Sequence, residues 1–281
     1  MLLGSCFTDH IGQWLSDAWL PVMCNPYGVL FNPASIANTL LRLLGNDLYL
    51  PVVHEHNGRY YSFDHHGKWS GEDPDLLTQQ LIDLESETRT FLNTAKHLFI
   101  TLGTSWVYER EGMIVANCHK FPASDFTRRR LSVDEIVEQW SQVIEALLTP
   151  HFTFTVSPIR HVKDTLHGNQ LSKATLLLAI EELQHRYPAQ VQYLPVYELF
   201  IDDLRDYRFH ADDLVHPSSM AIEMVKELFS ECAMTPRLCQ YMHDAAPIVR
   251  ALQHRPSDPE SPQYQAFLAE TLKKKQQLIN S

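Results

Sequence analysis

The chain contains 281 residues, of which 44% are hydrophobic and 20% are charged, a composition typical of a soluble globular protein with one large core or at most two. Asp and Glu number 34 against 23 Lys and Arg, and the resulting net charge of −11 argues against nucleic acid as a partner. Apolar runs stay well short of the roughly 20 residues that a membrane helix needs, and the start of the chain lacks the basic and apolar regions of a secretory signal. We therefore expect no membrane partner and a cytoplasmic location.

The first quarter of the chain predicts a strand, a tight turn and a helix, followed by a second strand and helix. Leu2 and Leu3 run directly into Gly4 and Ser5, after which apolar residues recur at helical spacing. This strand is short for a central strand, so we expect further residues upstream of Met1 in the natural chain. Residues 22–24 predict the second strand, and a helix begins near Pro33. Residues 46–75 are rich in His, Asn, Gly and Asp and predict an irregular insertion with a small hairpin and no assigned chemistry.

The remaining sequence continues the alternation of strands and helices. The patterns predict helices over 74–94, 132–148, 170–186 and 262–279 and strands over 97–102, 152–156 and 191–194. Such alternation is typical of an α/β protein, a three-layer α/β/α sandwich with a mainly parallel sheet, whose ligands bind beyond the carboxyl ends of the strands. We expect one domain over residues 1–254 and a C-terminal extension with a terminal helix over 255–281.

Three residues near the two ends of this domain form a candidate catalytic set. Ser5 lies between the first strand and its helix, where a hydroxyl can face the ligand crevice; a Ser chosen only for the turn is the alternative. Asp213 and His216 are separated by three positions, so a carboxylate can orient the imidazole that takes a proton from a serine. Asp-x-x-His alone is a weak motif.

The order of several short motifs makes the assignment more specific. Gly4-Ser5-Cys6-Phe7 resembles the GSCFA family, which is named after this N-terminal motif, although Thr8 replaces its Ala. Further blocks that resemble the family extend to about residue 220: Asn25-Pro26-Tyr27-Gly28, Asn32-Pro33-Ala34-Ser35-Ile36, Leu102-Gly103-Thr104-Ser105-Trp106, Asn117-Cys118-His119-Lys120, Ser157-Pro158-Ile159-Arg160-His161 and Leu204-Arg205-Asp206-Tyr207-Arg208-Phe209.

The family in turn resembles SGNH-type hydrolases, which implies a flavodoxin-like α/β fold and a triad of Ser5, Asp213 and His216. The same resemblance implies an oxyanion hole made by the Ser5 amide, by Gly28 after the second strand and by an Asn after the third. The chain departs from this pattern because residues 103–106 contain no Asn. Asn117 is our substitute, although it could equally cap a turn.

Four residues are candidates for substrate binding, namely Trp106, His119, Arg160 and His161. Arg160 and His161 follow a strand and should project toward the crevice, where Arg can hold a carboxylate or sugar hydroxyls. The structural alternatives are a polar loop for His119, together with Lys120, and a buried ion pair for Arg160.

The other candidate nucleophiles and ligands receive structural interpretations. Cys6 is intrinsically the better nucleophile, but neighbouring residues leaving a strand point in opposite directions, and the family parallel selects Ser5. The five cysteines form an odd set without paired spacing, which indicates reduced thiols. Leu3 to Cys6 superficially resembles a lipoprotein cleavage box, but only two residues precede it. His54, His56, His65 and His66 lack a matching carboxylate or Cys pattern, so we expect no metal.

The sequence therefore predicts a metal-free and cofactor-free serine acyl hydrolase or acyltransferase. The expected substrate is a small acyl ester, with an acylated sugar as the candidate that the resemblance implies. Its mechanism requires Ser5 Oγ within hydrogen-bond reach of His216, allowing for a looser geometry without ligand. The alternatives are a non-catalytic glycan- or acyl-binding protein on the same fold and, ranked last, a metal-dependent enzyme that uses the His-rich insertion.

Overall fold

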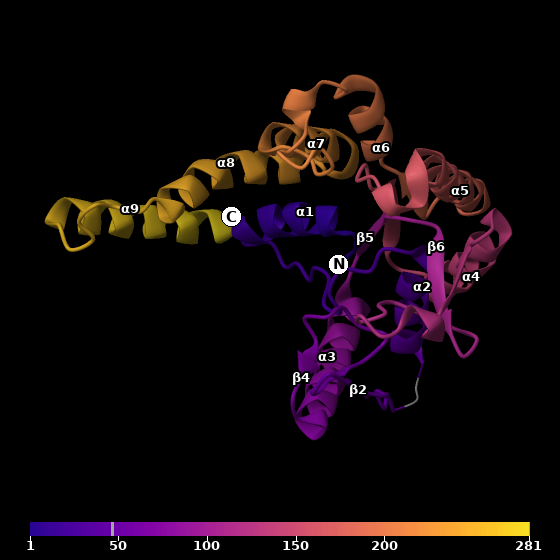
Figure 1. Ribbon diagram of the computed structural model, residues 1–281. Coiled ribbons are helices and arrows are strands. Elements are labelled where there is room, and N and C mark those ends of the chain that lie inside the picture. The colour runs from indigo at the N-terminus through magenta and orange to yellow at the C-terminus, as the bar shows by residue number, and fades with distance from the viewer. Residues whose placement is uncertain (46–47, 281) are drawn as a thin grey trace.

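The computed structural model describes residues 1–45 and 48–280 and has a parallel four-stranded sheet at its centre (Figure 1). The strands are β1 (Leu2–Gly4), β5 (His97–Leu102), β9 (His151–Val156) and β10 (Val191–Tyr193), in the order β1-β5-β9-β10. Leu3 pairs with Ile100, which pairs with Phe154. Beyond β1, Cys24 forms a single parallel bridge with Leu2, so the strand predicted over 22–24 is reduced to one bridge.

Apolar side chains from the sheet enter two clusters, because neighbouring residues of a strand point to opposite faces. Leu3, Ile100 and Phe154 belong to the larger cluster, together with residues of α2 (Pro33–Leu44), α3 (Pro74–Thr94), α4 (Val133–Ala146) and α5 (Thr165–Arg186). Leu2 and Phe99 belong to the second cluster, with residues of α1 (Cys6–Asp17), α7 (Ser219–Ala233) and α8 (Pro236–Gln253). The predicted α/β class with a parallel sheet is therefore confirmed.

Two small antiparallel sheets lie outside the central sheet. The insertion forms β2 (His54–His56), β3 (Arg59–Tyr61) and β4 (Ser70–Gly71), in agreement with the predicted small hairpin; its first predicted residues, 46 and 47, lie outside the described residues. The other sheet consists of β6 (Trp106–Arg110), β7 (Met113–Val115) and β8 (Thr127–Arg130), in the order β7-β6-β8. This second sheet was not predicted, because its strands are short and β8 consists of a Thr and three Arg.

Several predicted elements have the bounds that the sequence indicated. The helices α3 and α9 (Pro262–Ile279) and the strand β5 match the predicted ranges. Ser132 and Glu135 form both hydrogen bonds of the predicted capping box at the start of α4. By contrast, α5 begins five residues before the predicted range, and α7 and α8 were not predicted. The shorter turns are α6 (Val196–Glu198), η1 (Ala123–Asp125), η2 (Val162–Asp164), η3 (Leu199–Asp203) and η4 (Tyr207–Phe209).

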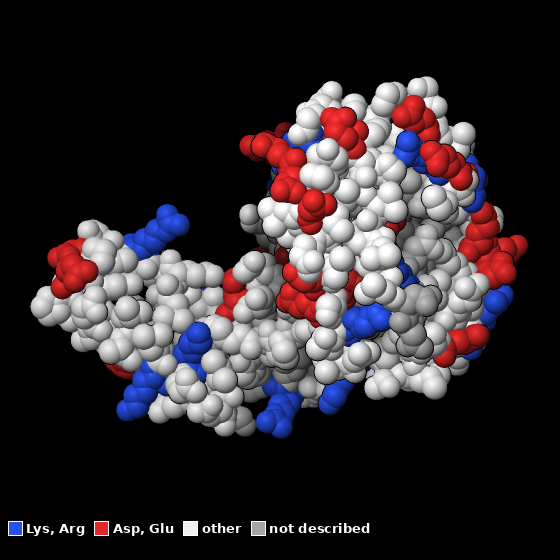
Figure 2. Space-filling view, turned by 90° about the horizontal axis from the view of Figure 1, so that it is seen from below, with Lys and Arg blue, Asp and Glu red and all other residues white. Residues whose placement is uncertain are grey.

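The helices α8 and α9 form an arm that extends from the body and returns to α1 (Figure 1). The Tyr241 hydroxyl donates to Ala18 O at 2.9 Å, and the Lys275 amine lies 4.7 Å from the centre of the Trp19 ring. On the face drawn in Figure 2, acidic and basic side chains are interspersed over the body and the arm. Within the described residues, none of the helices has the length and apolar composition needed to cross a membrane.

Candidate active site

The turn between β1 and α1 is fixed by hydrogen bonds from three other segments. The Gly4 amide donates to Asn25 Oδ1 at 2.9 Å, and Gly4 O accepts from the Leu30 amide at 3.0 Å. The Ser5 amide donates to Thr101 O at 3.2 Å. Gly4 has φ +143°, and a Cβ there would lie 2.2 Å from Thr101 O, so only glycine fits at this position. The turn thus holds Ser5 at the carboxyl end of β1.

Ser5 is the N-cap of α1 and is only 2% exposed. Its side chain makes none of the capping bonds that serines usually form there, and Ser5 Oγ has no hydrogen-bond partner among the described residues. A buried hydroxyl is normally satisfied. This one is left available at the positive end of a helix.

Asp213 and His216 form the pair that the sequence predicts. His216 Nδ1 lies 2.5 Å from Asp213 Oδ2, while Asp213 Oδ1 accepts from the Val215 and His216 amides, both at 2.9 Å. These hydrogen bonds, the one from the His216 amide above all, lower the pKa of Asp213 to about 2. Both side chains are 51% exposed. The carboxylate is therefore ionised at neutral pH and fixes the orientation of the imidazole.

The charge of His216 acts on α1, but His216 does not bond to Ser5 in this conformation. The pKa of His10, in the second turn of α1, is lowered by burial and, among smaller contributions, by the charge of His216. No hydrogen bond joins Ser5 Oγ to His216, because Ser5 Oγ is without a partner. The expected contact between nucleophile and base is absent, whereas the contact between base and orienting carboxylate is formed.

The predicted oxyanion donors are engaged elsewhere. The Ser5 amide donates to Thr101 O, and the Gly28 amide donates to Asn25 O at 2.8 Å. Gly28 has φ +81°, and a Cβ there would lie 2.2 Å from Cβ of His66. Asn117 Oδ1 accepts from the His119 amide at 2.9 Å. The side chain therefore caps a turn, which is the alternative to the oxyanion role that the sequence left open.

Four of the predicted site residues line one groove of about 690 Å³, and His119 is not among them. Trp106, Asn117, Arg160 and His161 meet there with side chains of Phe31 and the β7-β6-β8 sheet. His119 instead stacks on Tyr61, with ring centres 4.8 Å apart, and its Nε2 lies 2.8 Å from Ser62 O. His119 thus packs within the insertion, and its role at the substrate stays a prediction.

Comparison with known families agrees with the resemblance that the short motifs indicate. The sequence model of the GSCFA family matches residues 1–229. The chain belongs to the GSCFA family. The model of the GSCFA domain protein, C-terminal domain, matches residues 245–281, which include the end of α8 and all of α9. A comparison with curated proteins found no match.

The GSCFA domain contains a buried lysine that the sequence analysis missed. Lys173 Nζ on α5 donates to Gly103 O at 2.6 Å and to Ser157 O at 2.7 Å, and so joins the segments that follow β5 and β9. Burial lowers the pKa of this amine to about 7. Ser172 supports the same junction by accepting from the Ser105 amide at 2.8 Å. The signal was present, because Lys173 falls on the apolar stripe of Leu176, Ile180 and Leu183.

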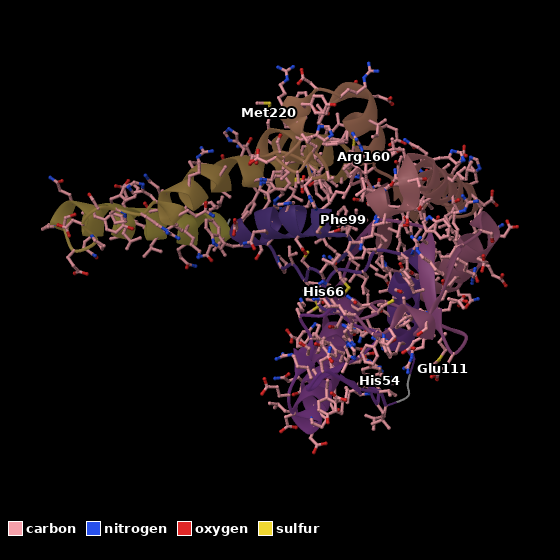
Figure 3. All side chains as sticks on the ribbon, viewed as in Figure 1. His54, His66, Phe99, Glu111, Arg160 and Met220 are labelled. Atoms are coloured by element: carbon pink, nitrogen blue, oxygen red, sulfur yellow. The ribbon has the colours of Figure 1, made fainter. Side chains whose placement is uncertain are left out.

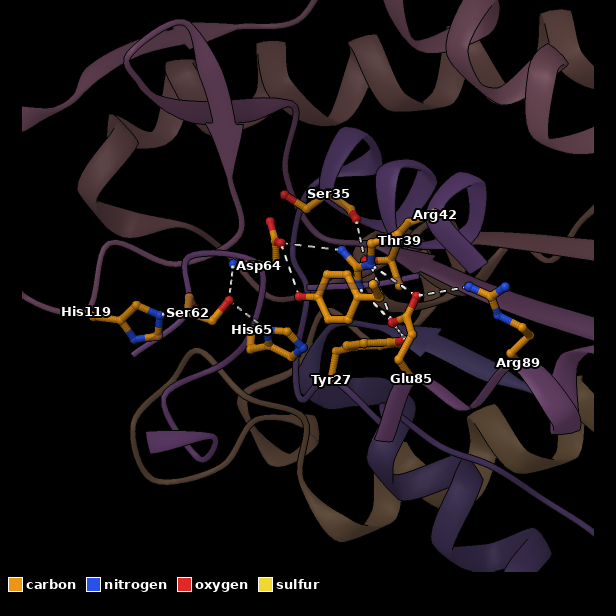
Figure 4. Close-up of polar contacts among 11 residues, drawn as sticks. Tyr27, Ser35, Thr39, Arg42, Ser62, Asp64, His65, Glu85, Arg89 and His119 are labelled. Atoms are coloured by element: carbon orange, nitrogen blue, oxygen red, sulfur yellow. Dashed lines mark hydrogen bonds and ion pairs between the residues drawn. The ribbon is translucent and has the colours of Figure 1, made fainter. Parts of the chain in front are cut away.

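A second buried network anchors the segment around Gly28 (Figure 4). The Tyr27 hydroxyl donates to Glu85 Oε2 at 2.5 Å, and Arg42 pairs with both Glu85 and Asp64. His65 Nδ1 lies 3.0 Å from Ser62 Oγ, and burial lowers the pKa of His65 to about 3. The network joins α2, α3 and the insertion behind the loop of residues 25–28.

Two histidines of the insertion in this GSCFA protein pack against aromatic rings, and the cysteines are free thiols. The His54 ring packs at a tilt against Phe63 and the His56 ring stacks on Phe121, with ring centres 4.6 and 4.4 Å apart. All five cysteines are free. In the part of the chain that the structure describes, no group of three or more His, Cys, Asp or Glu side chains is arranged to hold a metal ion.

Proposed function

We propose that this GSCFA protein is a serine-dependent acyl-ester hydrolase or acyltransferase of the SGNH type, acting on a small acyl ester such as an acylated sugar. The observation that carries the proposal is the Asp213–His216 hydrogen bond together with the Ser5 hydroxyl at the N-cap of α1, which has no partner among the described residues. A buried hydroxyl without a partner, an imidazole and an orienting carboxylate are the three groups that nucleophilic acyl transfer requires.

The strand arrangement supports the finer part of the fold proposal. If the Cys24 bridge is counted as a remnant of the second strand, the strand order becomes 2-1-3-4-5, the order of flavodoxin-like sheets. The two apolar clusters take alternate residues of the same strands, which supports a three-layer α/β/α arrangement. In such folds ligands bind at the carboxyl ends of the strands, the end at which Ser5 lies.

The hydrogen bonds of the pair define the tautomer of the base. Because the Asp213 carboxylate is ionised at neutral pH and accepts from His216 Nδ1, the imidazole proton lies on Nδ1 and Nε2 has a free electron pair. We propose that Nε2 removes the hydroxyl proton as Ser5 Oγ attacks the ester carbonyl carbon. The same proton then passes to the departing alcohol oxygen, which leaves an acyl group on Ser5. Water or a second hydroxyl takes up that acyl group.

The first turn of α1 is the proposed source of stabilisation for the negative oxygen of the intermediate. The Cys6 and Phe7 amides open the helix, where the positive end of its dipole lies. A role for the Gly28 amide would require its bond to Asn25 O to open.

The thiol next to Ser5 is the poorer candidate at neutral pH. Burial and the nearby Asp9 carboxylate raise the pKa of Cys6, and two backbone amides only partly oppose this. The thiol stays protonated, and the thiol form is a weak nucleophile.

Labelling with a fluorophosphonate probe tests the proposed function. The wild type should be labelled, Ser5→Ala should not, and Cys6→Ala, the matched control at the adjacent residue, should be labelled like the wild type. Loss of labelling in Cys6→Ala with retention in Ser5→Ala would make the thiol the nucleophile. A folded wild type that is not labelled would contradict an activated serine.

A non-catalytic binding protein on the same fold is the second candidate. The missing bond between Ser5 and His216 and the engaged Gly28 amide favour it. This candidate predicts no turnover of any acyl ester by a folded sample, whereas loss of one oxyanion donor typically costs only about 10²–10³ in rate and leaves measurable activity.

The cytoplasmic location also stays a proposal, supported by the five free thiols.

A further inference from the structure

The groove that collects four of the predicted site residues lies next to the Ser5 turn. The Leu30 amide bonds to Gly4 O, and the adjacent Phe31 O accepts from the Gly103 amide at 2.8 Å and the Thr104 amide at 3.0 Å. Phe31 and Thr104 both line the groove. Hydrogen bonds therefore connect the inner wall of the groove to the turn that holds Ser5.

The groove is locally cationic although the whole chain has a net charge of −11. Arg128, Arg160 and Lys163 line it, against Asp164 as the carboxylate among the described lining residues. Asp164 is already paired with Arg128. Burial and the nearby Lys173 amine lower the pKa of His161 to about 4, so this imidazole is neutral at pH 7. Among the described residues, Arg160 and Lys163 thus have no carboxylate as an ion-pair partner.

Arg160, which Figure 3 labels, differs in its partners from Arg42 and Arg128. Arg42 pairs with Glu85 and Arg128 with Asp164. Arg160 Nη2 contacts a ring nitrogen, His210 Nε2, at 3.4 Å, and the guanidinium pairs with no carboxylate among the described residues. A guanidinium has five N–H donors in a planar fork that matches carboxylate and phosphate oxygens. The N–H groups of Arg160 that pair with no carboxylate are suited to bind the oxygens of an anionic ligand in the groove.

Aromatic side chains provide the apolar part of the same surface. Phe31 and Tyr108 are 37% and 42% exposed, which is unusual for large rings on this molecule, and both line the groove. Trp106 also lines it, with Arg128 stacked 4.4 Å from the ring centre. Arg128 also lies over the Tyr108 ring, 5.4 Å from its centre. Partly exposed aromatic rings beside cationic side chains fit a ligand that has an apolar ring face and an anionic substituent.

We propose that this groove binds the alcohol part of the ester, and that this part is a sugar ring with an anionic substituent, a carboxylate or a phosphate, held by Arg160 and Lys163. The inference rests on the proposed function in one respect, namely that the bound ring presents its acyl ester to Ser5. The binding of the anion does not depend on turnover, so it can be measured separately.

Titration calorimetry with the Ser5→Ala protein tests the proposal without any reaction. The probes are methyl glucoside, methyl glucuronide and methyl glucoside 6-phosphate, which share one ring and differ in charge. At least one anionic sugar should bind about 10-fold or more tightly than the neutral one, and added salt should weaken that preference. The glucuronide and the phosphate arms distinguish the two sources of negative charge. Equal binding of all three probes would overturn the proposal.

Charge-neutral variants locate the receptor. Arg160→Gln, in the Ser5→Ala background, should lower the affinity for the preferred anionic sugar by about 10- to 100-fold, as expected for charge-assisted hydrogen bonds. Lys163→Gln changes an exposed side chain and should weaken binding by a smaller factor without affecting folding. Arg255→Gln, which removes the same charge from the arm, is the matched control and should have no effect. Equal affinities of the groove variants and this control would contradict the assignment.

The two proposals fail in different experiments. Fluorophosphonate labelling of the wild type without a preference for anionic sugars would retain the serine enzyme and remove the anion receptor. Preference for anionic sugars that depends on Arg160, in a folded wild type that is not labelled, would retain the receptor in a binding protein.

Discussion

The two halves of the candidate active site are held in contrasting ways. The Ser5 turn is buried and is tied to the backbone of β5, to the side chain of Asn25 and to the backbone amide of Leu30. The loop with Asp213 and His216 is exposed and is held mainly by its own hydrogen bonds, including Ala211 N to His216 O at 2.8 Å. The nucleophile is therefore fixed by the core, whereas the base is positioned by a surface loop. This difference explains why the hydrogen bond between Asp213 and His216 is formed while the contact between Ser5 and His216 is not.

The largest expected effect concerns the surface loop and separates catalysis from stability. Asp213→Asn should slow fluorophosphonate labelling by about 10³–10⁴-fold, because an amide in place of the carboxylate no longer fixes the Nδ1–H tautomer. His216→Ala should lower the labelling rate at least as much. Since both side chains are exposed, the free energy of unfolding should change by less than about 1 kcal/mol.

Labelling rates and thermal unfolding of the same samples check this pair of outcomes. Asp212→Asn, an exposed neighbour, is the matched control and should be labelled like the wild type. Because the pKa of Asp213 is held at about 2, the carboxylate stays ionised from pH 4 upward and should contribute no inflection to the pH profile of labelling in that range. Wild-type labelling by Asp213→Asn would place the base elsewhere.

The buried half should respond in the opposite way, with stability and activity lost together. Asn25 is 3% exposed, accepts from the Gly4 amide through Oδ1 and donates to Asp9 through Nδ2 at 2.7 Å. Asn25→Ala leaves a buried amide without a partner, so the protein should lose about 2–4 kcal/mol of stability. Denaturant unfolding measures this loss.

The exposed Asn38 offers the control for that substitution. Asn38→Ala should change the free energy of unfolding by no more than about 0.5 kcal/mol and leave labelling unchanged. If Asn25→Ala were as stable as Asn38→Ala, the sheet-side turn would not depend on this side chain, and the contrast between the two halves would be lost.

The next prediction concerns Lys173, which lies where the groove joins the sheet. Its expected effect is a dependence of the free energy of unfolding on pH. The folded pKa of Lys173 is about 7 and its unfolded pKa about 10.4, so between these values the unfolded chain binds a proton that the folded chain does not. Wild-type stability should therefore gain from Lys173 as pH rises from 7 toward 10, by at most about 1.4 kcal/mol per pH unit. Below pH 7 this contribution should be constant.

Lys173→Met removes the titration and leaves Gly103 O and Ser157 O without this donor. The difference in unfolding free energy between wild type and variant, measured at several pH values from 6 to 10, should grow in favour of the wild type. Lys163→Met, an exposed lysine of the groove, should follow the wild-type curve. Parallel curves for wild type and Lys173→Met would show that the buried amine is not perturbed.

The contrast between the two halves also explains what the sequence could predict. Ser5, Asp213 and His216 could be named as candidates because a turn after a strand and an i, i+3 carboxylate and imidazole are local patterns. The hydrogen bonds observed at Asp213 are local as well. The helices with strong caps, such as α4, were predicted for the same reason. Local signals cannot set the distance between Ser5 and His216, which depends on how a surface loop packs against α1.

The missed features depend mostly on contacts between distant segments. In the sequence, Lys173 resembles an ordinary surface lysine of a helix. It is buried because its position on α5 faces the residues that follow β5 and β9. The strand predicted over 22–24 is a single bridge because only Cys24 pairs with β1. The amides of Gly28 and Ser5 were assigned to an oxyanion from the motif order; the Gly28 amide bonds within its own turn to Asn25 O, whereas the bond of the Ser5 amide to Thr101 O joins distant segments.

The smallest predicted effect tests whether the ends of the surface loop control the base. Ser218 is the N-cap of α7, where its Oγ accepts from the Ala221 amide at 3.4 Å and donates to Arg208 O at 2.9 Å. Ser218→Ala should cost about 1 kcal/mol of stability. It should also slow fluorophosphonate labelling by a few-fold, because the loop that presents His216 loses its link to residue 208.

Ser261→Ala provides the matched comparison, since Ser261 caps α9 on the arm through the Tyr264 amide at 3.3 Å. The two variants should lose similar stability, as each removes one N-cap, but only Ser218→Ala should change the labelling rate. Thermal unfolding and labelling of the two variants at the same temperature compare these effects directly. Equal labelling of both would mean that the base loop is positioned without its anchor at α7, and that the approach of His216 to Ser5 is decided within residues 210–217 alone.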